Sequence, residues 1–264
     1  AANQKAPAPS PPFPLYAETA VPASSPPLPP APTPDSFASY IYESNPNLTA
    51  LDYSSTAILP PTEDAGQEYI DNITFLGDST TYGFIFYESL AGGRNTKQVW
   101  TGFDGTMTLS FQDSVLIKDP EDGTGRTIRQ CAQLRKPDFL VVTLGLNGIS
   151  FMGEEYFISE YKSLITDIKA LSPETTVVLQ SIYPISQNYI YWGSITNDMV
   201  TRANSWVLQI AEETSCPYLD TYSVLAADDG SIKRQFESGD GIHLSPEGLD
   251  TVLEYIRTHA YISE

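Results

Sequence analysis

An apolar run passes directly into a polar helix start in the segment Phe75-Leu76-Gly77-Asp78-Ser79-Thr80-Thr81-Tyr82-Gly83. The apolar part predicts a buried strand at Ile73–Gly77, and the residues after it predict a helix at about residues 80–90. A strand that leads straight into a helix is the start of a βα unit, so this segment predicts an α/β protein. Such proteins bind ligands at the carboxyl ends of their strands, which is where Ser79 lies.

The same alternation of apolar and amphipathic stretches continues to the end of the chain. Further strands are predicted at Gln98–Thr101, Phe139–Gly145, Thr176–Ser181 and Tyr218–Thr221. Further helices are predicted at about residues 125–135, 154–171, 197–214 and 246–260, the last of them after Ser245-Pro246. We therefore expect a three-layer α/β domain built around a parallel sheet.

Residues 1–34 differ in composition from the rest of the chain. They hold 12 of the 21 prolines, and proline is excluded from helix interiors and central strands. We expect an extended arm or linker here, which is either a spacer or a segment that docks on the domain or on a partner. Residues 35–70 are expected to form a lead-in of a short helix and loops, and residues 71–264 the α/β domain.

The charge of the chain excludes several classes of partner. With 33 acidic and 14 basic residues the net charge is −19, and a field of that sign repels nucleic-acid phosphates and anionic lipid heads. No apolar run approaches the roughly 18 residues that a membrane-spanning helix needs. The chain has only two His and two Cys, so a structural zinc site with four such ligands is not expected, and neither is any other cofactor.

The Cys and His residues leave one imidazole for chemistry. Cys131 and Cys216 are expected to be small buried side chains, and a disulfide between them stays open because sequence does not supply its geometry. His259 lies in the last predicted helix, where a surface or packing role is expected. His243 is then the candidate base.

Ser79 is a candidate nucleophile because a Ser at a helix start lies beside free backbone N–H groups and the positive end of the helix dipole. An N-cap Ser is the plain alternative, and a phosphate cradle is a weaker one, since no Gly-rich loop with a Lys follows. Asp240 precedes His243 by three residues, just ahead of the last helix. A serine nucleophile needs such a base and orienting carboxylate, although a surface turn has the same spacing.

Two further segments offer donors for a developing oxyanion. Asn147 follows a strongly apolar strand and has Gly residues near it, so it suits either a side-chain N–H donor or an ordinary turn. After the second strand, the backbone N–H of Gly102 or Gly105 is a second candidate donor. The loss of one such donor typically costs about 10²–10³ in rate, so the positions of these groups matter for the mechanism.

Four blocks of the sequence together resemble the SGNH (GDSL-type) hydrolase family. They are Gly77-Asp78-Ser79, a Gly after the second strand, Gly145-x-Asn147 and Asp240-x-x-His243, in the family's order and over roughly residues 70–262. The resemblance implies a flavodoxin-like α/β/α fold with five parallel strands in the order 2-1-3-4-5. It also implies ester hydrolysis through an acyl-enzyme without a metal, carried by residues 71–264 as the catalytic domain.

The resemblance implies a role for each residue of a catalytic triad. Ser79 corresponds to the nucleophile, His243 to the general base and then acid, and Asp240 to the residue that orients His243. Thr80 follows the nucleophile where the family more often has Leu. This departure does not touch the triad itself.

The resemblance also implies an oxyanion hole. The Ser79 N–H, a Gly N–H and the Asn147 side chain would form it. We favour Gly105 over Gly102, because the Gly-Thr pair of its turn is more similar to the family's block. Gly148 stands where the family usually has Asp after the Asn.

Aromatic side chains after the third and fourth strands predict a substrate pocket that stacks on a sugar ring. They are Phe151, Tyr183, Tyr189, Tyr191 and Trp192, and ordinary packing under a long loop is the alternative. An acidic chain with a Pro-rich arm is typical of an extracellular or cell-envelope protein of bacterial type, which the arm would tether. We expect a small-molecule or glycan ester as substrate, with short acyl (acetyl) groups on carbohydrate or cell-wall glycans.

Three other functions fit the same sequence. An O-acyltransferase would pass the acyl group to a glycan hydroxyl in place of water. A lipase- or lysophospholipase-type acylhydrolase would accept longer chains. A glycan-binding module of the envelope would use the pocket without catalysis, although it would have no need of Ser79, Asp240 and His243 together.

Overall fold

The computed structural model describes residues 51–187, 189 and 194–262. The described residues all belong to one compact unit of the chain, Thr49–Glu264. The predicted Pro-rich arm at 1–34 and the start of the predicted lead-in, 35–50, lie outside the described residues.

Five parallel strands form the central sheet, in the order β2-β1-β5-β6-β7. Their bounds are Ile73–Gly77 (β1), Val99–Trp100 (β2), Phe139–Thr143 (β5), Thr176–Gln180 (β6) and Tyr218–Leu219 (β7). This confirms the predicted fold and the strand order 2-1-3-4-5. The strands at both edges of the sheet are two residues long, shorter than predicted, because the chain turns away at Gly102 and enters a helix at Thr221.

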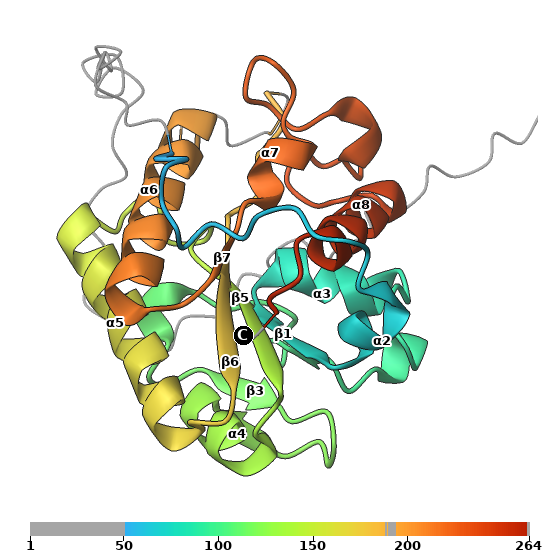
Figure 1. Ribbon diagram of the computed structural model, residues 1–264, viewed down its shortest axis with the longest axis vertical. Helices are drawn as coiled ribbons and strands as arrows, with labels where there is room; N and C mark the ends of the chain where they lie inside the picture. The colour runs from blue at the N-terminus through green and yellow to red at the C-terminus, as the bar shows by residue number, and fades with distance from the viewer. Residues whose placement is uncertain (1–50, 188, 190–193, 263–264) are drawn as a thin grey trace, which may run out of the picture. The chain divides into compact units, whose positions relative to one another are not determined.

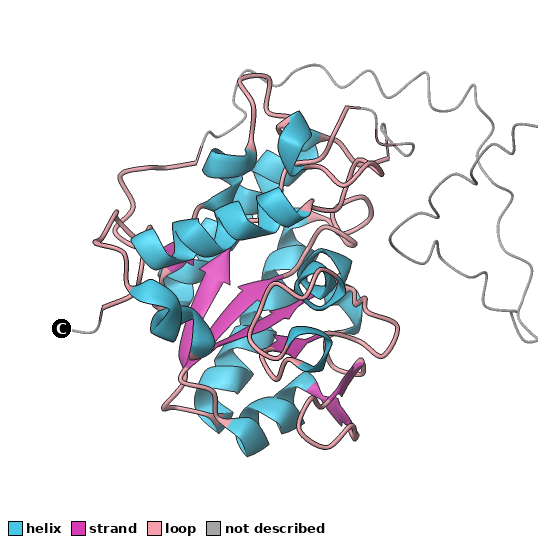
Figure 2. Ribbon diagram, turned by 90° about the vertical axis from the view of Figure 1, so that its right-hand side faces the viewer, coloured by secondary structure: helices cyan, strands magenta, loops and turns pink. Residues whose placement is uncertain are grey.

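Helices cover both faces of the sheet (Figures 1 and 2). One face carries α4 (Ile128–Arg135), α5 (Glu154–Leu171) and α6 (Asn197–Thr214). The other carries α2 (Gly66–Asp71), α3 (Ser79–Phe86), α7 (Thr221–Leu225) and α8 (Pro246–Thr258). The described part of the chain is therefore the three-layer α/β/α arrangement that the sequence predicts.

Alternate residues of the central strands fill two separate cores. Leu76, Val142 and Leu179 pack against the α4–α5–α6 layer. Their neighbours Phe75 and Val141 pack against the opposite layer. Because side chains alternate across a strand and both faces are covered, these strands are continuous apolar runs rather than alternating ones.

One predicted helix starts later than expected. Residues 125–135 were expected to be helical, but Gly125–Thr127 forms strand β4, antiparallel to β3 at Leu116–Lys118. Helix α4 starts after Thr127, whose side chain accepts from the N–H of Gln130 while the Gln130 side chain accepts from the N–H of Thr127. This capping box sets the helix start, and the β3–β4 pairing takes the residues before it.

Residues 51–70 belong to the same unit as the sheet. Ile58 forms a parallel bridge with Tyr218, and the N–H of Leu59 donates to the Tyr218 carbonyl oxygen at 2.9 Å. The N–H of Thr62 donates to the carbonyl of Thr258 at the end of α8. The lead-in therefore covers the open edge of β7, which would otherwise expose unpaired backbone groups.

Cys131 and Cys216 are both free and buried, so no disulfide joins them. Burial raises the pKa of the Cys131 thiol to about 12, which makes it a packing residue rather than a nucleophile. Among the helices of the described segments, none is both long and apolar enough to cross a bilayer.

Gly145 links β5 to the segment that carries Asn147, and its backbone φ is +129°. A Cβ at this position would lie 2.8 Å from Ile182 Cδ1 and from Phe157 Cζ. We expect Gly145→Ala to lower the free energy of unfolding by about 1–3 kcal/mol, because the substitution combines backbone strain with overpacking. Urea unfolding measures this loss.

Gly83→Ala is the matched control for this substitution. Gly83 lies inside α3, and a Cβ there would lie 3.5 Å from Leu249, an ordinary contact. Its free energy of unfolding should stay level or rise, since Ala is the better helix former. Equal stability of the two variants would contradict the tight packing at Gly145.

Candidate active site

Ser79 is the first residue of α3 and is separated from the end of β1 only by Asp78, but it does not cap the helix. Asp78 is the N-cap, and its Oδ1 accepts from the N–H of Thr80 at 3.0 Å and from the Thr80 hydroxyl at 2.8 Å. The alternative interpretation of Ser79 as an N-cap is therefore wrong. Because Asp78 fills that role, the Ser79 hydroxyl is left available for another partner.

The partner of Ser79 is His243, 164 residues further along the chain. His243 Nε2 lies 2.9 Å from Ser79 Oγ, and His243 Nδ1 lies 2.7 Å from Asp240 Oδ2. An ionised carboxylate can only accept, so it fixes the imidazole proton on Nδ1 and leaves Nε2 as an acceptor for the serine hydroxyl. The structure thus joins the three residues in the order that proton transfer from serine requires.

Asp240 is held ionised by its hydrogen bonds. Burial alone would raise the pKa of its carboxyl, but the bond from the His243 ring and the backbone N–H groups of His243 and Ile242 bring that pKa down to about 2. Both backbone bonds reach Oδ1 at 3.0 Å, and Oδ2 is left for the ring. The carboxylate is therefore charged at neutral pH and able to stabilise a protonated His243.

The three groups expected to donate to an oxyanion differ in the hydrogen bonds that they already make. Ser79 N–H, in the first turn of α3, has no acceptor among the described residues and is a free donor. Gly105 N–H donates to the Gly102 carbonyl oxygen at 2.9 Å within its own turn. Asn147 Nδ2 donates to Met107 O at 2.9 Å and to Thr106 Oγ1 at 3.1 Å. The hydrogen bond that closes this turn uses the Gly105 N–H. The expectation that Gly105 offers a free N–H therefore does not fit the turn.

Residues 75–250 match the profile of the GDSL-like Lipase/Acylhydrolase family. The chain belongs to this family. The acylhydrolase has no match among curated proteins.

Two solved structures resemble this GDSL-like acylhydrolase in fold. One, from Streptococcus pneumonia and provisionally described as a platelet activating factor, has a TM-score of 0.53 at 18% identity, over 72% of this chain and 84% of that one. The other is a GDSL-like lipase from Bacteroides thetaiotaomicron, with a TM-score of 0.51 at 16% identity, over 74% of this chain and 89% of that one. At such identities the likeness shows the fold alone.

A glutamate that the sequence analysis missed holds the His243 loop of the acylhydrolase. Glu237 Oε1 accepts from the backbone N–H groups of Gly239 at 2.6 Å and Gly241 at 2.5 Å. The N–H of Ser238 donates to the His243 carbonyl oxygen at 3.0 Å, which closes the loop. A carboxylate two residues ahead of a Gly-x-Gly run is the local signal that could have indicated this turn.

The loop after β6 also forms a hydrogen bond to the loop that carries His243. The N–H of Ser186 donates to the Gly241 carbonyl oxygen at 2.8 Å. The neighbouring Ile185 is clamped by the buried Asn197 of α6, whose amide accepts from the Ile185 N–H at 2.9 Å and donates to its carbonyl oxygen at 2.8 Å. The position of His243 is therefore set by contacts from separate parts of the fold.

We expect Glu237→Ala to lower kcat by up to about 10²-fold, because a shift of about 1 Å in a catalytic group has effects of that size. Glu237→Gln should retain more activity, since its amide oxygen can still accept from both Gly N–H groups. Steady-state kinetics on an activated ester measure both variants. Asp250→Ala, at an exposed position of α8, is the control, and an equal loss there would contradict the role of Glu237.

The residues of the predicted aromatic pocket lie in different surroundings. Tyr183 is 1% exposed, and its hydroxyl accepts from Gln180 Nε2 at 2.7 Å, so it belongs to the core and does not line a pocket. The chain after β6 turns inward here, which the sequence pattern could not distinguish from an exposed loop. Phe151 is 61% exposed and stays a candidate contact. Tyr191 and Trp192 lie outside the described residues.

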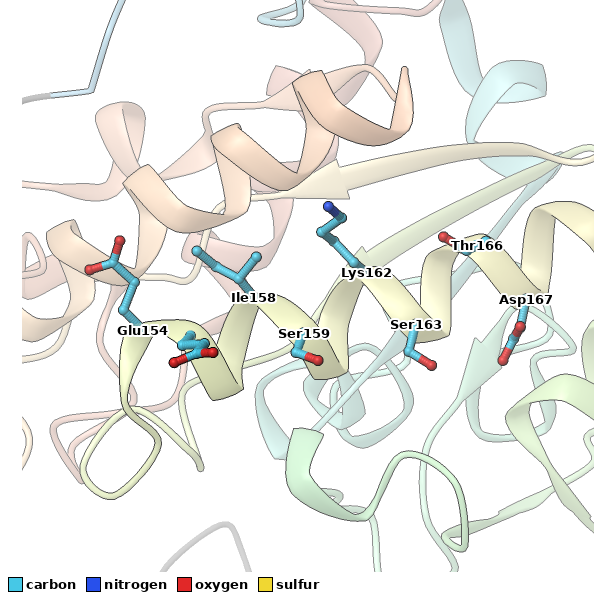
Figure 3. A pocket seen from close by; sticks show the side chains of 8 residues that line it. Glu154, Ile158, Ser159, Lys162, Ser163, Thr166 and Asp167 are labelled. Atoms are coloured by element: carbon cyan, nitrogen blue, oxygen red, sulfur yellow. The ribbon is translucent and has the colours of Figure 1, made fainter.

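A hollow lies along the exposed face of α5 (Figure 3). It measures about 870 Å³ and is lined by Glu154, Glu155, Ile158, Ser159, Lys162, Ser163, Thr166 and Asp167. All of these come from one helix, and none belongs to the Ser79–His243 arrangement.

The remaining polar groups of the described residues do not form a metal centre. No three His, Cys, Asp or Glu side chains of the described residues are grouped to hold an ion. His259 stacks on Tyr255 with ring centroids 3.8 Å apart, so it packs at the end of α8.

Proposed function

We propose that this acylhydrolase is a serine-dependent esterase in which Ser79, His243 and Asp240 form a catalytic triad. The observation that carries the proposal is the continuous chain of hydrogen bonds Ser79 Oγ–His243 Nε2–His243 Nδ1–Asp240 Oδ2, at 2.9 and 2.7 Å. The same three groups supply a nucleophile, a base and an orienting carboxylate.

In the first half of the proposed reaction, Ser79 Oγ forms a bond to the ester carbonyl carbon while its proton passes to His243 Nε2. The carbonyl oxygen becomes an oxyanion facing the Ser79 N–H. The bond to the leaving alcohol then breaks, and that alcohol takes the proton from His243 Nε2. Asp240 stabilises the imidazolium that exists between these two transfers.

In the second half, a water molecule attacks the acyl-Ser79 carbonyl carbon and gives a proton to His243 Nε2. The bond from the acyl carbon to Ser79 Oγ breaks, and Ser79 recovers its proton from the imidazolium. The acid leaves and the triad returns to its starting state. With a glycan hydroxyl in place of water, the same steps give acyl transfer.

The proposed substrate is a neutral ester with a short acyl group, such as an acetyl group on a carbohydrate or cell-wall glycan. A net charge of −19 disfavours polyanionic substrates, and the exposed Phe151 ring, four residues after Asn147, offers a surface that can stack on a sugar. We also propose an extracellular or envelope location, with the Pro-rich arm as a tether to an envelope partner.

One observation favours a longer acyl chain as the second candidate. Phe103 and Leu116 are 58% and 46% exposed, and they lie together over Gly125, where a Cβ would be 3.0 Å from Phe103 Cε2 and 3.5 Å from Leu116 Cδ1. Phe103 is two residues from Gly105, so this apolar pair flanks a loop of the site. Apolar surface of this kind suits a lipid-like chain.

A chain-length series tests the function and the substrate together. Wild-type protein is assayed on p-nitrophenyl acetate, butyrate and palmitate and on an acetylated xylan, and is labelled with a fluorophosphonate. We expect labelling and the highest kcat/KM for acetate. Higher kcat/KM for palmitate would support the lipase-type candidate, and a wild type that is neither labelled nor active would overturn the esterase proposal.

A further inference from the structure

A small cavity lies at the amino ends of β1 and β2. It measures about 270 Å³ and is lined by residues of these two strands, the β3–β4 turn and the end of α4. Ile73, the first residue of β1, lines it, whereas Ser79 follows the last residue, Gly77, by two positions. A strand rises about 3.3 Å per residue, so the two ends of β1 are about 13 Å apart. The cavity and Ser79 are therefore at opposite ends of this strand.

The floor of the cavity comes from one face of the sheet. Val99 packs into the core on the α3–α8 side, so its neighbours Gln98 and Trp100 face the α4 side. Phe75 pairs in register with Val99, which places Thr74 beside Gln98. Thr74 has a small side chain and α4 ends at Arg135, and the space above the floor is left open.

Two nearly buried side chains of the floor keep a polar atom without a partner. Gln98 is 8% exposed, and its Nε2 donates to the carbonyl oxygens of Ile70 at 2.6 Å and Ile73 at 2.9 Å. Its Oε1 accepts from no described residue, and Nε1 of Trp100, which is 2% exposed, donates to none. Neither atom is sealed off from solvent, and both side chains line the cavity. Because buried polar atoms normally have partners, this acceptor and this donor point to a polar ligand.

The charges around the cavity are already paired. The Arg135 guanidinium donates to Asp119 Oδ2 at 2.9 Å and to Asp122 Oδ2 at 3.1 Å. Lys97 Nζ lies 3.5 Å from Glu121 Oε2. Each cation of the cavity wall therefore has a carboxylate beside it, and an anionic ligand would find no unpaired positive charge there. A neutral ligand fits this balance better.

A sugar unit has the chemistry that these groups require. A hydroxyl both donates and accepts, so neighbouring hydroxyls of one sugar ring can donate to Gln98 Oε1 and accept from Trp100 Nε1. The Pro120 and Pro137 rings also line the cavity and offer apolar surface to the C–H face of such a ring. The volume is just below the roughly 300–1,000 Å³ of typical small-molecule sites, which leaves room for one sugar unit.

We propose that this cavity binds one sugar unit of a glycan and holds the polymer on the enzyme at the end of β1 opposite to Ser79. The choice of a glycan rests on the proposed function, whereas the cavity and its two unpartnered atoms do not. No bond is made or broken at this site. Its effect is on concentration, because a glycan held there keeps its other ester groups near Ser79.

Isothermal titration with xylohexaose and chitohexaose, which carry no ester, tests the binding. We expect saturable binding of at least one of them to the wild type. Trp100→Phe keeps an aromatic ring but removes the Nε1 donor, and should weaken binding about tenfold, as the loss of one hydrogen bond does. Thr74→Met fills the cavity from its floor and should abolish binding. Trp206→Phe, on α6 beside Phe157, is the matched control and should bind like the wild type.

Steady-state kinetics test what the site does for the enzyme. On acetylated xylan, Trp100→Phe and Thr74→Met should raise KM several-fold with kcat unchanged, and on p-nitrophenyl acetate both should match the wild type. A wild type that binds neither oligosaccharide, or variants that both bind as tightly as the wild type, would overturn the proposal. A wild type that binds an oligosaccharide but is neither active nor labelled by a fluorophosphonate would defeat the esterase function and still support the sugar site. The two failures are therefore distinguishable.

Discussion

Ser79→Ala should lower kcat/KM on p-nitrophenyl acetate by at least about 10⁴-fold and abolish fluorophosphonate labelling. The substitution removes the hydroxyl that lies 2.9 Å from His243 Nε2, and no covalent acyl-enzyme can then form. Some rate above the uncatalysed reaction should remain, because the Ser79 backbone N–H and the binding surfaces survive. Initial rates at high enzyme concentration measure this residual activity.

The control for Ser79→Ala is Ser159→Ala, at an exposed position of α5. It should be labelled and active like the wild type. A Ser79→Ala enzyme with a tenth or more of wild-type activity would show that another group is the nucleophile. Unchanged thermal unfolding of both variants excludes a folding defect as the cause.

Asp240→Asn should lower kcat by about 10⁴-fold while leaving the fold intact. The amide oxygen can still accept from the N–H groups of Ile242 and His243, which the carboxylate binds through Oδ1. The amide nitrogen then faces His243 Nδ1 and donates to it. This moves the imidazole proton to Nε2, where it points at Ser79 and blocks proton abstraction.

The charge of Asp240 also makes a measurable contribution to stability. Its pKa is about 2 in the folded protein, below the ordinary value of 3.8, so the stabilisation is present above about pH 4 and is lost as the pH falls from 3.8 towards 2. Urea unfolding of wild type and Asp240→Asn should therefore differ most near neutral pH and converge towards pH 2. A difference that grows with acidity would contradict an ionised Asp240.

Several features of the fold were predictable because they depend on local pattern. Buried strands such as Phe139–Thr143 are apolar on both faces, and the long helices α5 and α6 have the bounds that their apolar spacing predicts. The start of α4 was not predictable in the same way. In the sequence, Gly125–Thr127 resembles the first turn of a helix. It forms a strand because it pairs with β3, and that pairing is not visible in the local pattern.

The candidate site also combines features that local sequence predicts with features that depend on the tertiary structure. Asp240 and His243 are three residues apart, so their pairing depends on one loop and was visible in the sequence. Tyr183 has the composition of a pocket residue, yet its burial depends on how the chain after β6 folds back against the core. Glu237 acts only through the shape of the loop that it binds, and spacing alone does not reveal that shape.

The sequence by itself determined the α/β class, the strand order through the family resemblance, and the residue types available for acyl chemistry. The tertiary structure decided which of those residues meet. Ser79 and His243 come together because β1 and the loop before α8 end at the same edge of the sheet. It also decided that Gly105 donates its N–H to the Gly102 carbonyl oxygen within its own turn. Hydrogen-bond partners depend on distances between segments that lie far apart in the chain, and no local pattern encodes those distances.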